Sequence, residues 1–554
     1  MQTLLHRLQQ NWKSGLTLSL VAIPLSVSLA VAANATPVMG VITAIWAGLV
    51  AAILGGSNYN IVGPTGALSG ILAGYAVLYG MEALPVLAVF SGFMIVLFYL
   101  FHIDRYLIFI PSSVIHGFTL GVAFIIALNQ LNFALGLKGL PVHESFIENI
   151  VESLKHFSSF DPFTVGLFVA GLIFLFVLLK VSPKFPGPIF LAPIGIFLGY
   201  LSSRGMIPFE LQTLYTKFGA IDVQLVDFPS WGNLPPVTAL VGAAFAVTVI
   251  GVLETLISGK IADGMTKTKF NSRREVLGLG VANMVSGLCG GIPATAALAR
   301  TALNVKTGAT HRTSAAVSSV GVAIISLLFL SSFQFLPLAI VASILVYVAA
   351  RMISSEHFTH LYHYDRVAFG ISLLVAFITV VRDPIIGIFV GATLSLLIFV
   401  NKLSKAQNEI TLNKNKALVG RLYGASAHDL DADVLVYRFA GQMTYVNAQS
   451  HLENITHIHD SVHTVILAFR NLFYMDMDGV DAMAEIVETL EGEGKKVMIT
   501  GAGEFILPLL SQAEWFSEKE KRGEVFVGTT EALEYLGLKA VHQVQPEKRK
   551  RLIS

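Results

Sequence analysis

The chain has 554 residues, of which 54% are hydrophobic and 13% are charged, and its mean hydropathy is +0.69. An ordinary soluble domain carries about 25% charged residues, so these values exclude a wholly soluble protein. The charges are unevenly distributed: about 35 precede position 400, and about 38 fall in the last 154 residues. We therefore expect an apolar membrane body followed by a domain of ordinary soluble composition. The net charge of +1 gives no reason to expect nucleic acid as a partner.

Apolar segments long enough to cross a membrane recur through the first 400 residues. A spanning helix needs about 20 apolar residues, and most of these segments reach that length without interruption. The first carries no small-residue cleavage pattern, so we expect it to stay in the membrane rather than be removed as a signal peptide. The predicted segments, about fourteen in all, are 14–33, 37–54, 60–79, 84–101, 111–134, 161–180, 185–201, 237–262, 272–291, 292–303, 310–330, 334–350, 364–381 and 384–402.

Basic residues in the connections predict the orientation, because cytoplasmic loops are enriched in lysine and arginine. With the N-terminus inside, 14 basic residues fall on the inner side and five on the other. We therefore expect an integral protein of the inner (cytoplasmic) membrane, surrounded by membrane lipid, with both termini in the cytoplasm. The five residues expected on the outer side are Lys138, Lys155, Arg204, Lys217 and Arg382.

Two segments, 60–79 and 292–303, are interrupted by proline and rich in small residues. Each is the third segment in a run of seven, with Pro64 in the first and Pro293 in the second. Proline-interrupted short segments at matching positions of two halves are typical of inverted-repeat transporters, whose binding site lies near the middle of the membrane. The alternative is that the prolines only kink two spanning helices, which is common in membrane proteins. The match between the two halves favours the repeat.

Short helices that begin at Pro64 and Pro293 would form an anion site. Proline suits the first helical position because its missing N–H would be unpaired there anyway. Two helix N-termini that face each other combine positive dipole ends with free amides, and these bind an anion without a fixed cation. The amides expected to point at the anion are those of Thr65, Gly66, Ala294 and Thr295, and the two threonine hydroxyls add further donors.

Glu254 is the acidic residue that lies deep in segment 237–262, and a carboxylate inside a membrane usually marks function. Ser258 lies one turn further on the same helix face. These two residues are therefore candidates for a proton or sodium site. Arg300 follows Pro293 by about two turns. It either pairs with Glu254 to hold helices together, adds positive potential to the anion site, or extends to the cytoplasmic edge of the membrane.

Motifs typical of enzymes are missing from the sequence. It contains no HExxH or CxxC metal pattern, no GxSxG elbow and no GxxxxGK[ST] phosphate loop. Its single cysteine, Cys289, excludes an intramolecular disulfide. We expect a protein that is not an enzyme and binds no cofactor.

The sequence resembles the SulP anion permeases, also called solute carrier family 26, over essentially its whole length. Within it, Ala262–Lys269 is similar to the bicarbonate-transporting branch. The resemblance implies an α-helical polytopic membrane protein of 14 segments, arranged as a seven-plus-seven inverted repeat, with a cytoplasmic α/β STAS domain. The stretches that carry it are Gly55–Ser57, Gly63–Ser69, Glu254, Ile261–Asp263, Asn271–Glu275, Asn283, Gly290–Pro293 and Ala299–Asn304.

The resemblance also implies two groups of spans with the substrate between them. A core of spans 1–4 and 8–11 would move against a gate of spans 5–7 and 12–14, and the substrate would lie between spans 1, 3, 8 and 10. The implied coupling residues are Glu254 and Ser258, which together with Thr295 are also candidates for binding sodium. Together with Arg300, the substrate-site residues are Ile23, Pro24, Ser26, Thr65, Gly66, Ala67, Ala294, Thr295, Ala296 and Ala297.

Two departures from the family pattern bear on substrate and coupling. Many relatives carry Gly-Ser-x-Ser before the arginine, where this chain has Ala296-Ala297-Leu298-Ala299, so the second short helix lacks hydroxyl donors. The bicarbonate branch carries aspartate at the position of Glu254, so proton coupling is favoured over sodium coupling. The first departure favours bicarbonate, whereas the second is in keeping with sulfate symporters, and both substrates stay open.

The last part of the chain has the pattern of a small soluble domain, because strand-type runs alternate with helical patterns. By resemblance it is a STAS domain, and its loop Asp476–Val480 offers no serine or threonine for phosphorylation. The predicted strands are 434–439, 464–469 and 496–499, and the predicted helices are 447–458, 479–492 and 504–513. The expected domains are a cytoplasmic N-terminus (1–13), a transmembrane transport domain (14–402), a linker (403–417), the STAS domain (418–545) and a basic tail (546–554).

The leading hypothesis is secondary-active transport of a small oxyanion, bicarbonate or sulfate, by an elevator-like motion of a homodimer, coupled to protons or sodium. Dicarboxylates rank third as substrates. A nucleobase permease of the same fold is one alternative, against which the tail and Ala299-Arg300-Thr301 argue. A membrane sensor or scaffold that transports nothing and binds partners through its STAS domain is another.

Overall fold

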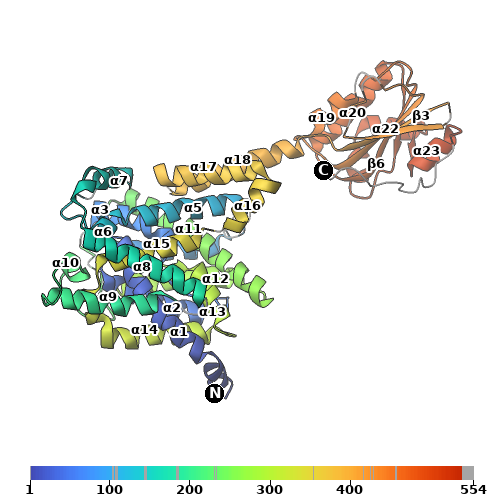
Figure 1. Cartoon of the computed structure of the whole chain (residues 1–554). Helices are drawn as coiled ribbons and strands as arrows, with labels where there is room; N and C mark the ends of the chain where they lie inside the picture. Colours follow the sequence, from blue (N-terminus) through green and yellow to red (C-terminus); the bar gives the residue numbers. More distant parts are fainter. Residues whose placement is uncertain are drawn as a thin grey trace. The chain divides into compact units, whose positions relative to one another are not determined.

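The computed structural model describes residues 2–538 except 103–104, 106–109, 142–145, 183–185, 230, 233, 354, 383, 416, 425, 428–429 and 456–457. The expected basic tail at 546–554 therefore lies outside the described residues. The chain divides into a helical unit, residues 1–395, and a C-terminal unit, residues 396–554, which contains a sheet (Figure 1).

Each of the expected membrane segments contains a helix. Within the described part of the chain, nine helices are long and apolar enough to cross a membrane. Short helices fill several connections: α6 (Leu131–Leu135), α7 (Phe146–Lys155), η2 (Phe157–Ser159), α10 (Leu214–Phe218), η3 (Leu330–Phe335) and α16 (Ser355–Tyr364). The helices of the expected segments are α1 (Gln2–Ala32), α2 (Pro37–Leu54), α3 (Gly66–Tyr79), α4 (Ala83–Leu100), α5 (Ser112–Leu128), α8 (Pro162–Val181), α9 (Pro188–Ser203), α11 (Val237–Thr266), α12 (Ser272–Leu288), α13 (Leu298–Lys306), α14 (Thr313–Phe329), α15 (Leu338–Met352), α17 (Arg366–Val381) and α18 (Pro384–Leu403).

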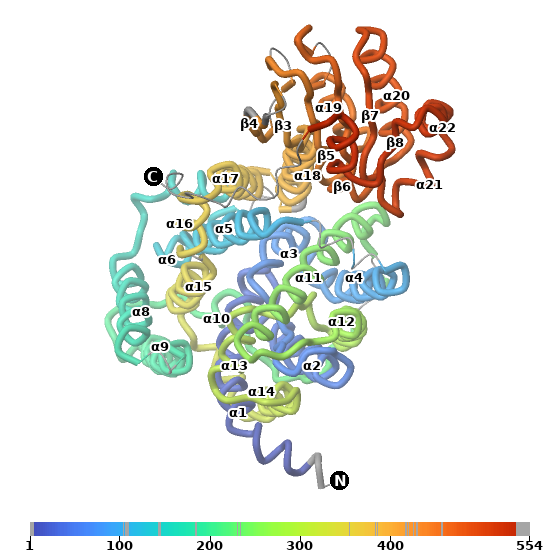
Figure 2. Tube along the Cα trace, turned by 90° about the vertical axis from the view of Figure 1, so that its right-hand side faces the viewer, coloured from blue at the N-terminus to red at the C-terminus, as the bar shows by residue number. Residues whose placement is uncertain are grey.

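These helices contact one another mainly within two groups. In the first, α12 packs on α2 and α4, and α14 packs on α1 and α2; in the second, α15 packs on α8 and α5, and α5 packs on α17. Figure 2 shows the two groups on different sides of the unit, with α3 next to α5 where they meet. The division agrees with the expected core and gate.

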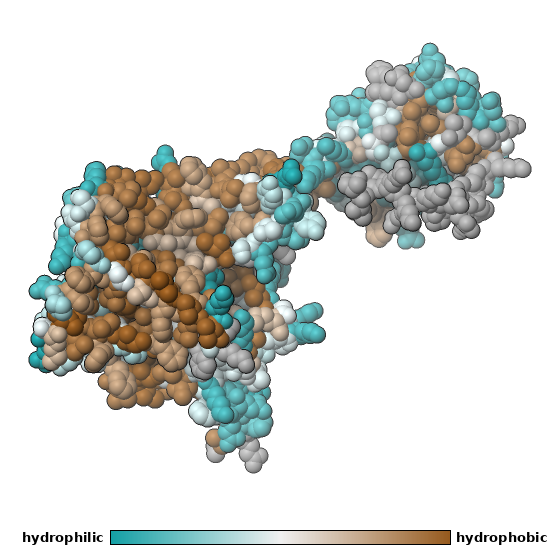
Figure 3. All heavy atoms as spheres, viewed as in Figure 1, coloured by the Kyte–Doolittle hydropathy of each residue, from teal (hydrophilic) through white to brown (hydrophobic). Residues whose placement is uncertain are grey.

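The outer surface of the helical unit is apolar, as a lipid-facing surface must be. Only 17% of the most apolar part of α8 is buried, and exposed side chains such as Phe163, Ile173 and Phe176 lie along it. Hydrophobic residues cover most of the face of this unit seen in Figure 3. This apolar surface agrees with the expectation that the helical unit lies in the hydrocarbon layer of a membrane.

A two-stranded antiparallel pairing joins the two halves of the unit. Strand β1 (Val62–Gly63) pairs with β2 (Thr295–Ala296), and Gly63 lies opposite Thr295. The expectation that Pro64 and Pro293 begin the two short helices is wrong. The residue before a proline prefers extended backbone, and here extended chain continues to the N-caps, Thr65 of α3 and Ala297 of α13. The pairing brings the two chain segments that carry these prolines side by side.

The C-terminal unit is a six-stranded sheet with the order β4-β3-β5-β6-β7-β8. Strand β3 pairs antiparallel with both β4 and β5. The pairs β5–β6, β6–β7 and β7–β8 are parallel. Its main core includes the fully buried rings of Tyr437, Phe439 and Phe469. Strands and helices are β3 (Asn408–Lys414), β4 (Ala417–Tyr423), β5 (Val434–Met443), α19 (Ala448–Ile455), β6 (Thr464–Met475), α20 (Met477–Gly492), β7 (Lys496–Thr500), α21 (Leu507–Leu510), α22 (Glu514–Lys521), β8 (Val525–Phe526) and α23 (Thr529–Tyr535).

Strand β3 occupies part of the stretch 403–417 that the sequence predicts to be a linker. This strand is buried although it is rich in polar residues. Ile410 and Leu412 are buried, and Thr411 and Asn413 are buried as well. Ile410 and Leu412 alternate with Thr411 and Asn413, but this run is only four residues long and lies among polar residues, so it is a weak signal for a strand. The sheet therefore begins earlier than expected.

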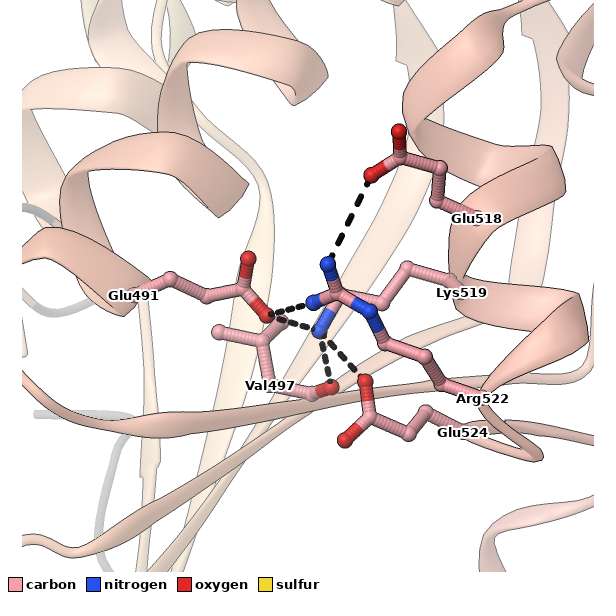
Figure 4. A network of polar contacts seen from close by, with 6 residues as sticks. All are labelled: Glu491, Val497, Glu518, Lys519, Arg522 and Glu524. Carbon is pink, nitrogen blue, oxygen red and sulfur yellow. Dashed lines mark hydrogen bonds and ion pairs between the residues drawn. The ribbon is translucent and has the colours of Figure 1, made fainter.

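A buried lysine ties α20, α22 and the start of β8 together (Figure 4). The Lys519 ammonium, with its side chain 2% exposed, donates to the Glu491 carboxylate, to Glu524 at 2.8 Å and to the Val497 carbonyl at 2.9 Å. Arg522 adds an ion pair with Glu491 at 3.5 Å. All three donor positions of the ammonium are filled, so burial of this charge is compensated.

Candidate anion-binding site

The carboxylate of Glu254 and the hydroxyl of Thr65 form the centre of the candidate site. Glu254 lies midway along α11 with a half-buried side chain. The Thr65 hydroxyl contacts both carboxylate oxygens, at 2.9 Å and 3.2 Å, while its Oγ1 accepts the Ala67 amide at 3.3 Å. Thr65 is thus the N-cap of α3 and the partner of Glu254 at once. This contact connects the start of the first short helix to the acidic residue.

Two threonines, Thr255 and Thr295, hold strand β2 in place. We call its pairing with β1 the crossing. The hydroxyls of Thr255 and Thr295 lie 2.8 Å apart, and Thr255 Oγ1 accepts the Ala296 amide at 3.1 Å. Thr295 also donates to the Gly251 carbonyl at 2.9 Å and lies within reach of the Glu254 carboxylate. Thr255 is absent from the residues that the sequence predicts, because a threonine in a membrane helix carries no signal that separates packing from function.

The amides expected to face an anion at the second short helix are used by the protein itself. The Ala294 amide donates to Asn283 Oδ1 at 2.8 Å, and Asn283 Nδ2 donates to the Ala294 carbonyl at 2.9 Å. The amide of Ala297 donates to the Ile61 carbonyl at 3.1 Å. Asn283 therefore substitutes for a neighbouring strand and satisfies backbone groups that hydrocarbon could not. The Ala294 amide is therefore not free for an anion, although Ala297, the N-cap of α13, makes no side-chain capping bond.

Arg300 lies beneath the crossing of the two strands. Its side chain is buried, and the guanidinium donates to the Pro64 carbonyl. A Cβ at Gly63 would lie only 2.6 Å from its Nη1, so glycine is what lets the guanidinium reach the strand. Arg300 does not extend to the membrane edge. Among the ion pairs of the described residues it makes none with Glu254 within 4 Å, although the two charges lie close enough to attract.

Ser258 is buried and forms its hydrogen bond with α13. Its hydroxyl donates to Thr301 Oγ1 at 2.9 Å, and that oxygen accepts the Ile61 amide at 3.2 Å. The hydrogen of the Ser258 hydroxyl is thus used by Thr301, and sodium binding by Glu254, Ser258 and Thr295 stays a prediction. Within the part of the chain that the structure describes, no group of three or more His, Cys, Asp or Glu side chains is suited to a metal ion.

The expected residues of α1 are buried, and this helix packs mainly on α14 and α2 and also contacts α3 and α13. Pro24 lies inside α1 and has no amide, so the carbonyl of Leu20 loses its helical partner. The Ser26 hydroxyl is fully buried and has no hydrogen-bond partner, and Ile23 is buried beside it. The unpaired Ser26 hydroxyl keeps its hydrogen-bonding capacity. The remaining expected residues, Gly66 and Ala67, form the buried first turn of α3.

Glu275 is a second buried carboxylate, which the sequence analysis did not single out. It accepts the amides of Gly56 and Ser57 at 2.6 Å and 2.7 Å and the Asn60 amide group at 2.7 Å. Three donors satisfy its oxygens, and the side chain is 3% exposed. It fixes the chain that leads into β1. Its position four residues inside a predicted membrane segment was the available signal.

Comparison with known proteins identifies both units. A model described as the sulfate permease family matches residues 8–375, and the STAS domain model matches residues 428–525. The chain is 32% identical over 501 residues to the putative sulfate transporter YvdB of Bacillus subtilis, covering 90% of this chain and 92% of YvdB. It is 24% identical over 410 residues to the bicarbonate transporter BicA of Picosynechococcus, covering 71% and 70% of the two chains.

A solved structure shares the fold. The murine Slc26a9 anion transporter in its inward-facing state is similar with a TM-score of 0.80 and 16% sequence identity, over 95% of this chain and 91% of that chain. These comparisons confirm the expected architecture, a multispan helical membrane body followed by a STAS domain.

Proposed function

Because this chain belongs to the sulfate permease family, we propose that it is a secondary-active transporter that carries bicarbonate or sulfate in symport with protons, with sodium as the alternative coupling ion. The observation that carries this proposal is the contact between Thr65 and Glu254. It places a carboxylate against the N-terminus of a short helix, where an anion would otherwise bind.

Charge repulsion between this carboxylate and the substrate supplies the coupling. Two negative charges about 5 Å apart repel by about 3 kcal/mol at an effective dielectric constant of about 20. Neutralising Glu254 by a proton therefore favours anion binding by about a hundredfold. The anion and the proton would bind together, and each would leave when the other leaves.

The first short helix and α1 supply the contacts for the anion. The positive dipole end of α3 begins at Gly66, and the unpaired Ser26 hydroxyl lies on α1, which packs against α3. Arg300 adds positive potential from below the crossing. Asn283, Thr255 and Thr295 position the second strand and do not contact the substrate in this proposal.

Transport by an elevator-like motion fits the two groups of helices. The group that contains α3, α11 and α13 carries all of the proposed site, and it would move against the group of α5, α8, α15 and α17. The homodimer, the position in the cytoplasmic membrane with both termini inside, the domain boundaries and the absence of enzymatic activity stay predictions from the sequence.

The test is uptake of radiolabelled sulfate or bicarbonate into proteoliposomes, under imposed proton or sodium gradients. Fumarate serves as a competitor that represents dicarboxylates. We expect an inward proton gradient to drive concentrative uptake of one of the two anions. Absence of transport of any anion under every gradient would favour the sensor reading instead.

Glu254→Gln tests the coupling residue directly. The variant should lose proton-driven accumulation and keep anion exchange, since a permanently neutral side chain neither repels the anion nor carries a proton. Glu82→Gln, at an exposed acidic N-cap of α4 whose side chain makes no capping bond, is the matched control. Wild-type pH dependence in Glu254→Gln would show that this carboxylate does not couple the two fluxes.

A further inference from the structure

A cavity of about 1000 Å³ lies within the helical unit, apart from the Thr65–Glu254 site. Its walls come from the end of α1, the second half of α3, the end of α5, the loop after α6, residues 210–217 and the end of α17. We call it the distal cavity, because α1 runs from the N-terminus at one face of the unit to Ala32 at this cavity. It therefore opens near the face opposite the N-terminus.

The charged residues that line the distal cavity are mostly cationic. Lys138, Lys217 and Arg382 line it, together with one acidic residue, Glu210. The three cations come from three connections that are far apart in the sequence. They are also three of the five basic residues that the charge pattern assigns to the outer side, so most of the positive charge of that side gathers at one cavity.

Three buried polar atoms on the same walls, Gln130 Oε1, the Tyr75 hydroxyl and Thr379 Oγ1, have no hydrogen-bond partner within the described structure. The Gln130 side chain is 1% exposed; its Nε2 donates to the Ile126 carbonyl at 3.2 Å, and its Oε1 is left unpaired. The Tyr75 hydroxyl, on α3, is likewise unpaired, with the side chain 6% exposed. A buried polar atom without a partner costs free energy, and a ligand with hydrogen-bonding groups would satisfy these atoms.

The distal cavity approaches the Thr65–Glu254 site along one face of α3. Gly66 and Gly70 on this face pack against α5: a Cβ at Gly66 would lie 2.5 Å from Ile126, and one at Gly70 would lie 3.4 Å from Ile125. Gly74, one turn further, has nothing within 4 Å of such an atom and lines the cavity. Only about one helical turn of apolar contact, about 6 Å long, separates the cavity from the first turn of α3.

We propose that the distal cavity is an outer recruitment site, in which a small oxyanion collects from the external solution before it passes the Ile125–Ile126 contact. Lys138, Lys217 and Arg382 attract the anion, and Gln130 and Tyr75 hydrogen-bond to it. The inference rests on the proposed function, since it names a second station for the same substrate. Positive clefts raise the local concentration of anions and lose this effect in salt.

Thiol labelling measures the potential of the cavity without any need for transport. The sequence contains one cysteine, so Cys289→Ser gives a cysteine-free background. In it, Gly74→Cys places a thiol on the cavity wall, and Leu78→Cys gives a second position should the first variant fail to fold. Right-side-out vesicles are treated with two membrane-impermeant methanethiosulfonates, one anionic (sulfonatoethyl) and one cationic (trimethylammonium-ethyl).

We expect the anionic reagent to react about tenfold faster than the cationic one at low ionic strength, relative to their rates with a free thiol. Neutralising Lys138, Lys217 and Arg382 together to glutamine should bring the two rates within about twofold. Sulfate or bicarbonate at millimolar concentration should slow labelling of the unaltered cavity. Neutralising Lys155 and Arg204, outer-side cations that do not line it, should change nothing. Equal rates for both reagents, no labelling at either position, or an equal effect of the control pair would overturn the proposal.

Transport kinetics give a second readout. The triple neutralisation should raise the KM for external anion about five- to tenfold at low ionic strength, leave the maximal rate unchanged, and have little effect in high salt. Normal anion uptake with equal labelling rates would reject the recruitment site and leave the proposed function standing. Charge-selective labelling in a protein that transports no anion would reject the proposed function and leave the distal cavity as a cationic site without a role in transport.

Discussion

The double role of Thr65 can be tested by Thr65→Val, which keeps the branched shape and removes the hydroxyl. The variant loses the cap that accepts the Ala67 amide at 3.3 Å and the donor to Glu254 at 2.9 Å. Loss of an N-cap costs about 1 kcal/mol, and loss of a hydrogen bond to a charged group costs about 1.5–3 kcal/mol. The free energy of unfolding should therefore fall by about 2.5–4 kcal/mol.

The chain offers a matched control at the start of α2. Thr36 is an N-cap of the same residue type, and its Oγ1 accepts the Met39 amide at the same 3.3 Å, but within the described part of the chain its side chain forms no other hydrogen bond. Thr36→Val should cost only the capping contribution, about 1 kcal/mol. The difference between the two variants isolates the bond to Glu254. Thr65→Ser, which restores a hydroxyl, should recover most of the loss.

The assay is unfolding of the purified protein in mixed micelles by increasing amounts of SDS, carried out as a double-mutant cycle with Glu254→Gln. A glutamine reduces the bond with Thr65 to a neutral one, so the coupling free energy between the two positions should be about 1–2 kcal/mol. A coupling below about 0.5 kcal/mol, the usual limit of additivity, would refute the central contact of the proposed site.

Two further predictions concern packing and pH. Gly56→Ala should abolish folded protein, because the new Cβ would lie 2.0 Å from the Asn271 carbonyl oxygen. Gly74→Ala, whose Cβ would have nothing within 4 Å, should fold normally. Equal yields of monodisperse protein from the two variants would contradict this prediction. In the C-terminal unit, burial lowers the pKa of His451 from its usual 6.5 to about 4, and its Nδ1 lies 3.0 Å from the Tyr437 hydroxyl. Since the unfolded chain then binds a proton that the folded unit does not, stability should fall by about 3 kcal/mol as the pH drops from 6.5 to 4. Urea unfolding of residues 404–554 measures this loss, which should be much smaller in His451→Gln.

The sequence was most informative where long apolar runs decide the structure. Every expected membrane segment contains a helix, because about 20 apolar residues have few alternatives in a bilayer. Glu254 was identified for a similar reason, since a carboxylate deep in such a run is rare. The contact with Thr65 was not predicted, because it joins residues that are distant in the sequence.

The details of the crossing could not be predicted because they depend on pairing over long distances. A strand of two residues such as β1 has no periodicity, and it forms only because β2 satisfies its backbone. Ser258 lies one turn from Glu254, as the helix period requires, but Thr301 on another helix takes its hydroxyl. The prolines were the right markers of the broken segments and the wrong markers of the helix starts.

The β1–β2 pairing has a mechanical consequence. Hydrogen bonds buried away from water cannot be exchanged for bonds to solvent. Separating β1 from β2 would therefore leave several backbone groups without hydrogen-bond partners in hydrocarbon. The two half-length helices must therefore travel as one rigid body during any change of access.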